Sequence, residues 1–236
     1  MSAKVITITN QKGGSGKTTV AVNLAGTLGR RGYEVLLADI DPQGSAAHYV
    51  STAAEGQEMA VTLAGLAKTG ERVHKYLQKF SEQYDYIVVD SPPVVDNKAT
   101  RSALLISHLV IIPVQPAPLD FESTKATVEL VENTQVQNRR LKARLLATAC
   151  PRTNIAEVML EALGEADVTL MEASLGYRTA YREAAGEGVT VHDMGYTAQP
   201  AADEVDALTD EVQNLLHPRG VPKPVPREKP DEDDDD

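Results

Sequence analysis

The chain has 236 residues, a single cysteine and a formal net charge of −11 at pH 7. This length suits one full α/β domain and is too short for two ordinary ones. One cysteine excludes an intrachain disulfide and an iron–sulfur cluster bound within one chain, so we expect Cys150 to be a buried structural thiol.

The sequence carries no sign of a membrane or secreted protein. No apolar run approaches the ~18 residues that span a bilayer, and the first residues lack the apolar core of a signal peptide. We therefore expect a cytoplasmic protein. Six of the negative charges lie at residues 231–236, which leaves −5 for residues 1–230. A body of this charge does not favour nucleic acid, so contact with DNA would need a local basic patch, or one completed by dimerisation.

Predicted strands and helices alternate along the chain. Apolar, β-branched segments predict strands at 4–9, 33–39, 84–90, 109–114 and 144–149, with a short last strand at 168–170. Helical patterns lie at 18–30, 72–83, 100–107, 120–139, 155–163, 181–185 and 201–216, whereas residues 46–67 give no clear pattern. This alternation predicts one doubly wound, mostly parallel sheet with helices on both faces.

The composition changes after His217. Residues 1–217 are predicted to form one domain, and residues 218–236 contain five prolines and the acidic block but no apolar periodicity. We expect this second part to be a disordered tail.

The sequence KGGSGKTT at residues 12–19 stands between the first predicted strand and the first predicted helix. Gly13, Gly14 and Gly16 leave no Cβ in the way, so backbone N–H groups can cradle phosphate oxygens, as can the helix N-terminus. Lys17 would reach the β- and γ-phosphates, and the Thr18 hydroxyl would hold Mg²⁺. This context predicts a nucleoside triphosphate site of the P-loop NTPase kind, with residues Gly13, Gly14, Ser15, Gly16, Lys17, Thr18 and Thr19 at the phosphates.

Aspartates end two further predicted strands. Asp39 and Asp41 follow the second strand, and Asp90 ends the strand at 84–90 before a Ser-Pro-Pro turn. Ligands bind beyond the carboxyl ends of the strands in open α/β sheets. We expect Asp90 to hold Mg²⁺ through a water molecule.

A second lysine, Lys12, precedes the first glycine of the loop, where an ordinary phosphate loop needs only Lys17. Together, KGGSGKTT (12–19), DIDPQG (39–44) and DSPP (90–93) resemble the deviant Walker-A ATPases of the ParA/MinD group, over roughly residues 4–216. Within that group, PVQPAPLDF (113–121) and RTAYREAAGEGVTV (178–191) look most like the small ParA-type partition ATPases. Ser15 stands where many relatives have Val, and the acidic tail is not part of the family pattern.

The resemblance implies a slow ATPase that uses ATP and Mg²⁺ and closes as an ATP-sandwich homodimer. Lys12 would reach the phosphates bound by the partner subunit, and Asp41 would position or activate the attacking water. Asp39 would support the outer shell of the metal. By analogy, Pro151 and Arg152 would line the adenine base.

The resemblance also implies partners. The ATP-bound dimer would bind double-stranded DNA non-specifically on the nucleoid, and a cargo-bound adaptor of the ParB kind would stimulate hydrolysis. The candidate DNA contacts are Arg139, Arg140, Lys142, Arg144, Arg178 and Arg182. Arg139 and Arg140 could instead complement a helix C-terminus, and Arg178 and Arg182 would share a helix face if that segment is helical.

The cargo stays open between a plasmid or chromosome, which is our main interpretation, and a protein microcompartment such as a carboxysome. A membrane-surface regulator of the MinD kind is disfavoured, because the apolar stripe at 202–216 faces an acidic opposite side and is better explained by packing on the sheet. A nitrogenase-like iron protein is excluded, because it needs two cysteine ligands per subunit and this chain has one cysteine. A small-molecule kinase or ligase on the same fold is disfavoured, because such enzymes lack a residue like Lys12.

Overall fold

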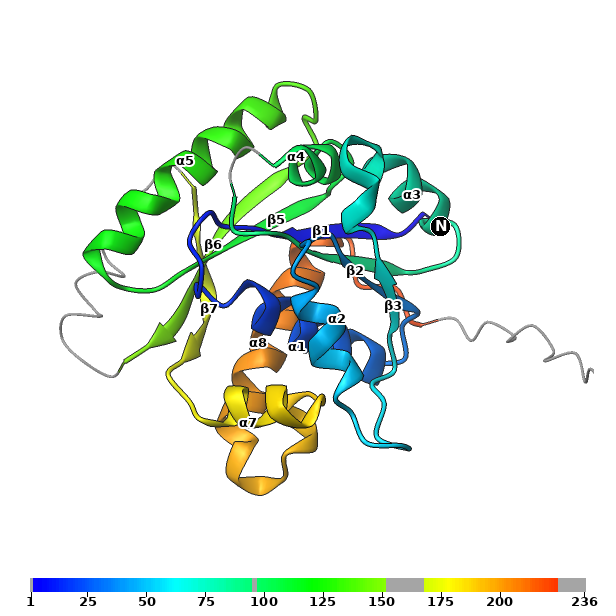
Figure 1. Cartoon of the computed structure of the whole chain (residues 1–236), viewed down its shortest axis with the longest axis vertical. Coiled ribbons are helices and arrows are strands. Elements are labelled where there is room, and N and C mark those ends of the chain that lie inside the picture. Colours follow the sequence, from blue (N-terminus) through cyan, green and yellow to red (C-terminus); the bar gives the residue numbers. More distant parts are fainter. Residues whose placement is uncertain (1, 95–96, 152–167, 225–236) are drawn as a thin grey trace, which may run out of the picture.

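A seven-stranded sheet in which every strand pair is parallel forms the centre of the molecule (Figure 1). The computed structural model describes residues 2–94, 97–151 and 168–224. The strand order is β3-β2-β4-β1-β5-β6-β7. The strands are β1 (Lys4–Ile8), β2 (Val35–Asp39), β3 (Thr62–Gly65), β4 (Tyr86–Asp90), β5 (Leu109–Val114), β6 (Lys142–Cys150) and β7 (Leu170–Gly176). The predicted mostly parallel sheet is confirmed.

Helices cover both faces of this sheet (Figure 1). One face carries α1 (Lys17–Arg30), α2 (Ser45–Ser51), α7 (Ala180–Glu187) and α8 (Gln199–Leu216). The other carries α3 (Val73–Phe80), α4 (Lys98–Leu104) and α5 (Pro118–Gln135). Every residue of β2, β4 and β5 is buried, because a strand covered on both faces has no solvent side. Short 3₁₀ helices lie at η1 (Ala67–Arg72), η2 (Val191–Asp193) and η3 (Tyr196–Ala198).

The structure corrects the sequence prediction in two places. Residues 46–67, which gave no clear pattern, contain most of α2 and the whole of the short edge strand β3. The last strand is β7, not residues 168–170, and it alternates buried and exposed residues as an edge strand does. The predicted helix at 155–163 lies outside the described residues, as does the part of the predicted tail from residue 225 onward.

The outer edge of β7 bonds to carboxylates of α8 instead of to another strand. The N–H groups of Glu172 and Ala173 donate to Glu211 at 3.2 and 2.9 Å. Further along, Gly176 donates its N–H to Glu204 at 3.0 Å. Helix α8 therefore covers this edge as well as one face of the sheet.

The apolar stripe of α8 packs into the core, as predicted. Its buried members are Ala202, Val205, Leu208, Val212 and Leu216. In the described ranges, no helix combines the length and apolarity that crossing a bilayer requires.

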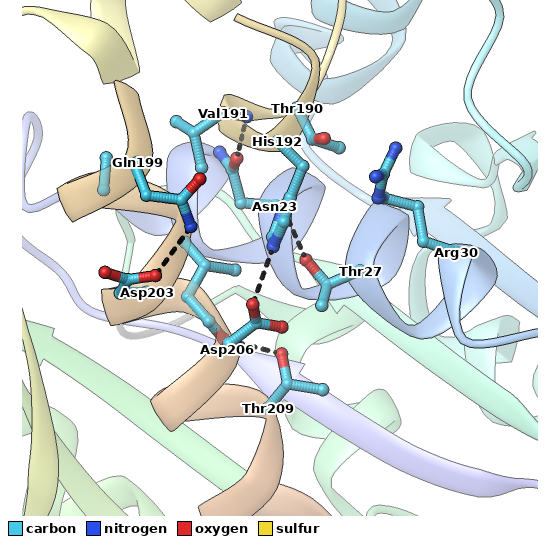
Figure 2. Close-up of polar contacts among 12 residues, drawn as sticks. Asn23, Thr27, Arg30, Thr190, Val191, His192, Gln199, Asp203, Asp206 and Thr209 are labelled. Atoms are coloured by element: carbon cyan, nitrogen blue, oxygen red, sulfur yellow. Dashed lines mark hydrogen bonds and ion pairs between the residues drawn. The ribbon is translucent and has the colours of Figure 1, made fainter. Parts of the chain in front are cut away.

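The 3₁₀ helix η2 fastens the C-terminal part of the chain to α1 (Figure 2). Asn23 of α1 accepts the N–H of Val191 at 3.0 Å. The ring of His192 lies between α1 and α8, with Nδ1 3.4 Å from the Thr27 hydroxyl and Nε2 3.2 Å from Asp206. Because α1 begins at the phosphate loop, these contacts fix the position of α8 relative to that loop.

Asp206 receives a second partner at the end of α1. Arg31 donates to Asp206 at 3.0 Å and to Asp210 at 2.6 Å. Burial alone would raise the pKa of Asp206, but the hydrogen bonds from Arg31 and His192 outweigh it, and the pKa lies below its usual value.

Asp206→Asn should lower the free energy of unfolding at neutral pH. A carboxylate whose pKa is lower in the folded state stabilises the fold above its unfolded pKa, about 3.9, and this contribution is lost as the pH falls through the folded pKa. The side chain is 44% exposed, so we expect a loss below about 1 kcal/mol. Urea unfolding between pH 7 and pH 3 should show the difference from the wild type closing at low pH.

The matched control is Asp203→Asn on the same helix, because Asp203 is exposed and accepts a hydrogen bond from Gln199 at 2.8 Å. A difference for Asp206→Asn that stayed constant over this pH range would contradict the role given to its charge.

Candidate nucleotide-binding site

The predicted phosphate loop and the two acidic loops meet at one edge of the sheet. In the strand register, Ile8 at the end of β1 and Asp39 at the end of β2 both lie opposite Asp90 at the end of β4. The three strands therefore stop level, and the loops that follow them share one site.

The loop itself has the conformation expected of a phosphate cradle. Gly14 and Gly16 have φ angles of 76° and 91°, which favour glycine. Helix α1 begins at Lys17, directly after Gly16, which has no side chain to cap it. The first N–H groups of α1 are thus placed to face an anion.

Side chains from neighbouring strands hold the loop through its carbonyl oxygens. Gln115 Nε2 donates to the carbonyl of Gly14 at 2.8 Å, and Thr148 Oγ1 donates to that of Ser15 at 2.9 Å. The Ser15 hydroxyl is buried without a partner in the described part of the chain. Gln115 and Thr148 fix the loop without using its N–H groups, and neither role was predicted from the sequence.

Lys17 is nearly fully buried, and its Nζ donates to the carbonyl of Lys12 at 2.8 Å. Burial lowers the pKa of Lys17, although Asp90 and Asp41 nearby oppose that shift. A buried ammonium group is costly unless charges compensate it. A phosphate in the loop would supply that charge.

Asp90 and Thr18 form the best candidate for a magnesium site. Thr18 Oγ1 donates to Asp90 Oδ2 at 2.8 Å, while Asp90 Oδ1 is buried and has no hydrogen-bond partner among the described residues. The pKa of Asp90 is raised to about 7, because burial and the charges of Asp39 and Asp41 outweigh the opposing effects of the Thr18 hydrogen bond and the Lys17 charge. Such oxygens fit Mg²⁺, which keeps several waters and shares its sphere with phosphates. In the described residues, no three His, Cys, Asp or Glu side chains converge into a protein cage for a metal.

Asp39 braces the loop that carries Asp41. Its two carboxylate oxygens accept the N–H groups of Asp41 and Ala47, each at 2.9 Å, and burial raises its pKa. Asp41 is also largely buried and accepts the N–H of Gln43 at 2.9 Å. Asp39 therefore holds Asp41 in place, as a residue outside the inner metal shell would.

Lys12 lies at the partly exposed start of the loop. Its N–H donates to Asn10 at 3.3 Å, and the Asn10 amide in turn donates to the carbonyl of Pro113 at 2.7 Å. The backbone at Lys12 is thus tied to β5. Gly13 is exposed beside it.

A pocket of about 240 Å³ opens directly beside the phosphate loop. Its walls are the loop, the start of α1 with Thr19, the ends of β6 and β7, and the start of α7. Ala149 in its lining has a φ of 48°, a strained value for a residue with a side chain. A nucleoside whose phosphates lie in the loop would extend into this pocket.

The sequence predicted this pocket only in part. Pro151 lies exposed just beyond β6, and Arg152 lies outside the described residues. The lining includes residues that the sequence did not single out, namely Thr148, Ala149, Leu175, Tyr177 and Tyr181. No local pattern marks them, because β7 and α7 bring them to the loop from far along the chain.

Arg178 and Arg182 line the same pocket. Arg178 precedes α7, which begins at Ala180, so the predicted shared helix face for the two arginines is wrong. Arg178 forms a salt bridge with Glu204 of α8 at 2.6 Å, and burial together with Glu204 raises the pKa of the neighbouring Tyr181. Arg182 lies over the ring of Tyr177, 5.2 Å from its centroid. Glu204 therefore holds Arg178 and Tyr181, two residues of the pocket wall, in place.

The six predicted DNA contacts do not form one patch. Arg139 and Arg140 lie before β6 at its amino end, and Lys142 donates to the carbonyl of Leu215 at 2.6 Å. Arg144 donates to the carbonyl of Ala143 at 2.7 Å. The nine residues of β6 span about 26 Å, so this group is far from the two arginines at the nucleotide edge.

Cys150 ends β6 beside this region and is half-buried. Burial and the charge of Glu204 together raise the pKa of its thiol to about 11, so the thiol is protonated at neutral pH. The predicted burial of Cys150 is therefore only partial.

Asp90→Asn should remove most of the effect of Mg²⁺ on nucleotide affinity. We expect a 10- to 100-fold loss of metal affinity, as is typical for residues that orient the water ligands of a metal. Titration of a fluorescent ATP analogue with and without Mg²⁺ measures this. In the wild type, Mg²⁺ should also bind more weakly below about pH 7, where the Asp90 carboxyl becomes protonated.

Asp203→Asn, far from the loop on α8, is the control for this change of charge. An Asp90→Asn protein with the magnesium dependence of the wild type would remove Asp90 from the metal site.

Comparisons with known proteins agree with this geometry. Residues 6–191 match the CobQ/CobB/MinD/ParA nucleotide binding domain. Maintenance of carboxysome distribution protein A of Halothiobacillus neapolitanus is 32% identical over 89% of this chain and 96% of that protein. Its counterpart in Gloeobacter kilaueensis is 33% identical over 89% and 94%. The sporulation initiation inhibitor protein Soj of Bacillus subtilis is 32% identical over 67% of this chain and 78% of that protein.

Solved structures share the fold at lower identity. Apo McdA of Cyanothece has a TM-score of 0.72 at 17% identity and covers 89% of this chain and 99% of that one. MinD of Pyrococcus horikoshii, complexed with Mg-ADP, has a TM-score of 0.71 at 21% identity and covers 92% and 99%. Since one domain match spans most of its length, the chain belongs to the CobQ/CobB/MinD/ParA nucleotide-binding family and is a ParA-type ATPase, as the loop motifs predicted.

Proposed function

We propose that this chain is a Mg²⁺-dependent ATPase that positions a protein microcompartment of the carboxysome kind. The observation that carries this proposal is the match to two carboxysome distribution proteins over 96% and 94% of their lengths. The likeness to Soj covers 78% of that protein. The comparisons thus favour the microcompartment, our alternative interpretation of the sequence, over the plasmid or chromosome.

ATP and Mg²⁺ are the cofactors that fit the site. Family members of the same fold have been solved with an ATP analogue and magnesium and with Mg-ADP. In this chain, Lys17 and the N–H groups of the loop would hold the β- and γ-phosphates, and Thr18 and Asp90 would hold the metal. Mg²⁺ would neutralise charge on the phosphate oxygens during hydrolysis.

Hydrolysis would depend on two residues at the rim of the loop. Asp41, fixed by Asp39, would orient the attacking water in line with the γ-phosphate. Lys12 lies at the partly exposed start of the loop, from which it would reach the phosphates of a second subunit in an ATP-sandwich dimer. A cargo-bound adaptor would stimulate this slow step.

The ATP-bound dimer would bind DNA non-specifically and so travel on the nucleoid. Arg139 and Arg140 are exposed and stay candidates for phosphate contacts. Lys142 and Arg144 each donate to a backbone carbonyl, and Arg178 and Arg182 line the pocket beside the loop. We therefore propose that Arg178 and Arg182 contact the nucleotide, and that any contact they make with DNA depends on whether nucleotide is bound.

The second candidate function is partition of a plasmid or chromosome by the same cycle. Soj and the chromosome partitioning protein ParA of Myxococcus xanthus, 27% identical over 69% of that protein, support it. A membrane-surface role has less support, since the apolar stripe of α8 lies in the core.

Binding to non-specific double-stranded DNA at low salt should require ATP and fail with ADP. Asp41→Ala should strengthen DNA binding in ATP, because the bound state would no longer end in hydrolysis. Lys12→Ala should abolish both DNA binding and ATP-dependent dimerisation, and Lys79→Ala, at an exposed lysine of α3 near the amino end of β1, should change neither. Electrophoretic mobility and light scattering measure the two properties. DNA binding that is the same in every nucleotide state would contradict the cycle.

Deleting the gene in its own host tests the cargo. We expect microcompartments to lose their even spacing and cluster, while plasmids and chromosomes are inherited as before, and fluorescence microscopy of a labelled shell protein measures this. Evenly spaced microcompartments together with plasmid or chromosome loss would replace the first candidate with the second.

A further inference from the structure

A second pocket lies at the opposite end of the sheet from the phosphate loop. It has a volume of about 540 Å³ and opens at the amino ends of β1, β4 and β5. Its walls include Val5 at the start of β1, Tyr86 at the start of β4 and His108 just before β5. None of the residues assigned to the nucleotide line it.

The charge of this pocket is strongly one-sided. Lys4, Arg140 and Lys223 line it together with His108 and His217, and Asp85 is the one carboxylate among the described lining residues. Asp85 is itself engaged, since its Oδ2 accepts the N–H of Glu34 at 3.0 Å. In the described ranges, no carboxylate forms a salt bridge with Lys4, Arg140 or Lys223.

The pKa values of the two histidines in this pocket are lowered by burial and by nearby positive charge. His108 Nδ1 accepts the N–H of Val5 at 3.1 Å. Burial, which is the largest cause, and the charges of Lys4, Arg140 and His217 together lower the pKa of His108 to about 4. Burial and Lys4 likewise lower the pKa of His217. Positive charge that disfavours protonation of both histidines also favours the binding of an anion in this pocket.

The chain after α8 builds one wall of the pocket. His217 Nε2 lies 3.0 Å from the hydroxyl of Tyr86, and the hydroxyl of Tyr33 donates to the carbonyl of Pro222 at 2.8 Å. Pro222 and Lys223 both line the pocket. The described part of the chain therefore ends, at residue 224, on the rim of a cationic cavity.

Twelve residues of the sequence follow, and residues 231–236 are all Asp or Glu. The six residues at 225–230 can span up to about 20 Å, enough to lead the acidic block back from the rim. A short tether of this kind gives an effective concentration in the millimolar range, which makes weak charge pairing sufficient.

We propose that the acidic segment 231–236 of this chain binds in the pocket formed by Lys4, Arg140, Lys223, His108 and His217. The segment is anionic and is tethered at the rim. Its carboxylates pair with the three cations, which hold no other carboxylate in the described residues. The inference does not depend on the proposed function.

Zero-length coupling with a carbodiimide tests this contact directly in the full chain. The reagent joins a carboxylate to a lysine amine only where the two touch. We expect the acidic block to be joined to Lys4, far from it in sequence, at least several-fold more often than to Lys75 and Lys79 of α3, which are not among the residues that line the pocket. Peptide mass spectrometry gives the ratio. Equal coupling to Lys4, Lys75 and Lys79 would overturn the proposal.

A second measurement uses His217 as the reporter. Neutralising the block (D231N, E232Q, D233N, D234N, D235N and D236N) should lower the pKa of His217, followed by NMR, by about half a pH unit, as expected for one or two carboxylates within about 8 Å in water. Salt at 1 M should abolish this difference. The matched control neutralises Glu183 and Glu187 on α7, which should leave His217 unchanged.

A His217 pKa that is the same with and without the acidic block would overturn the proposal. A His217 pKa that changes only when inorganic phosphate is added would also overturn it, since that result would assign the pocket to a free anion. Lys4→Gln with Arg140→Gln should abolish the effect of the acidic block on His217, whereas Lys75→Gln with Lys79→Gln should keep it.

Discussion

The hydrogen bond from Thr18 to the buried carboxylate of Asp90 joins the first turn of α1 to the end of β4. The rest of the site is arranged around it. For this bond to form, β4 must end level with β1, so that the loop after β1 can pass over the end of β4. The register meets this condition, because Ile8 lies opposite Asp90. Within the described residues, the bond leaves the other oxygen of Asp90 buried and unpaired, which is costly unless a further group pairs with it. A cation and a phosphate would together satisfy Asp90 and Lys17.

Much of this arrangement could be predicted from the sequence, because it depends on local patterns. The glycines at positions 14 and 16, the strand endings at Asp39 and Asp90, and the helix after Lys17 are each encoded within a few residues. A parallel sheet then brings such strand endings to one edge. The buried stripe of α8 was likewise visible as a helical period in the sequence.

What could not be predicted depends on long-range packing. The wall of the pocket beside the loop includes Arg178 and Tyr181, which are held by Glu204 of a later helix. The spacing of Arg178 and Arg182 would place them on one helix face only if the segment between them were helical, but α7 begins at Ala180 and leaves Arg178 outside it. Strand β3 was missed because an edge strand of four residues, half in contact with solvent, has little apolar pattern. The opposite pocket is assembled from six separate parts of the chain and has no sequence signature.

The carboxylates that α8 places along β7 have a consequence for how molecules of this protein can associate. An unpaired edge strand invites a strand from another molecule, and proteins avoid this by covering or charging the edge. Here Glu211 and Glu204 already occupy N–H groups of β7, and a second chain approaching that edge would meet negative charge instead of free donors. Association through a continuous sheet is thereby discouraged on this side.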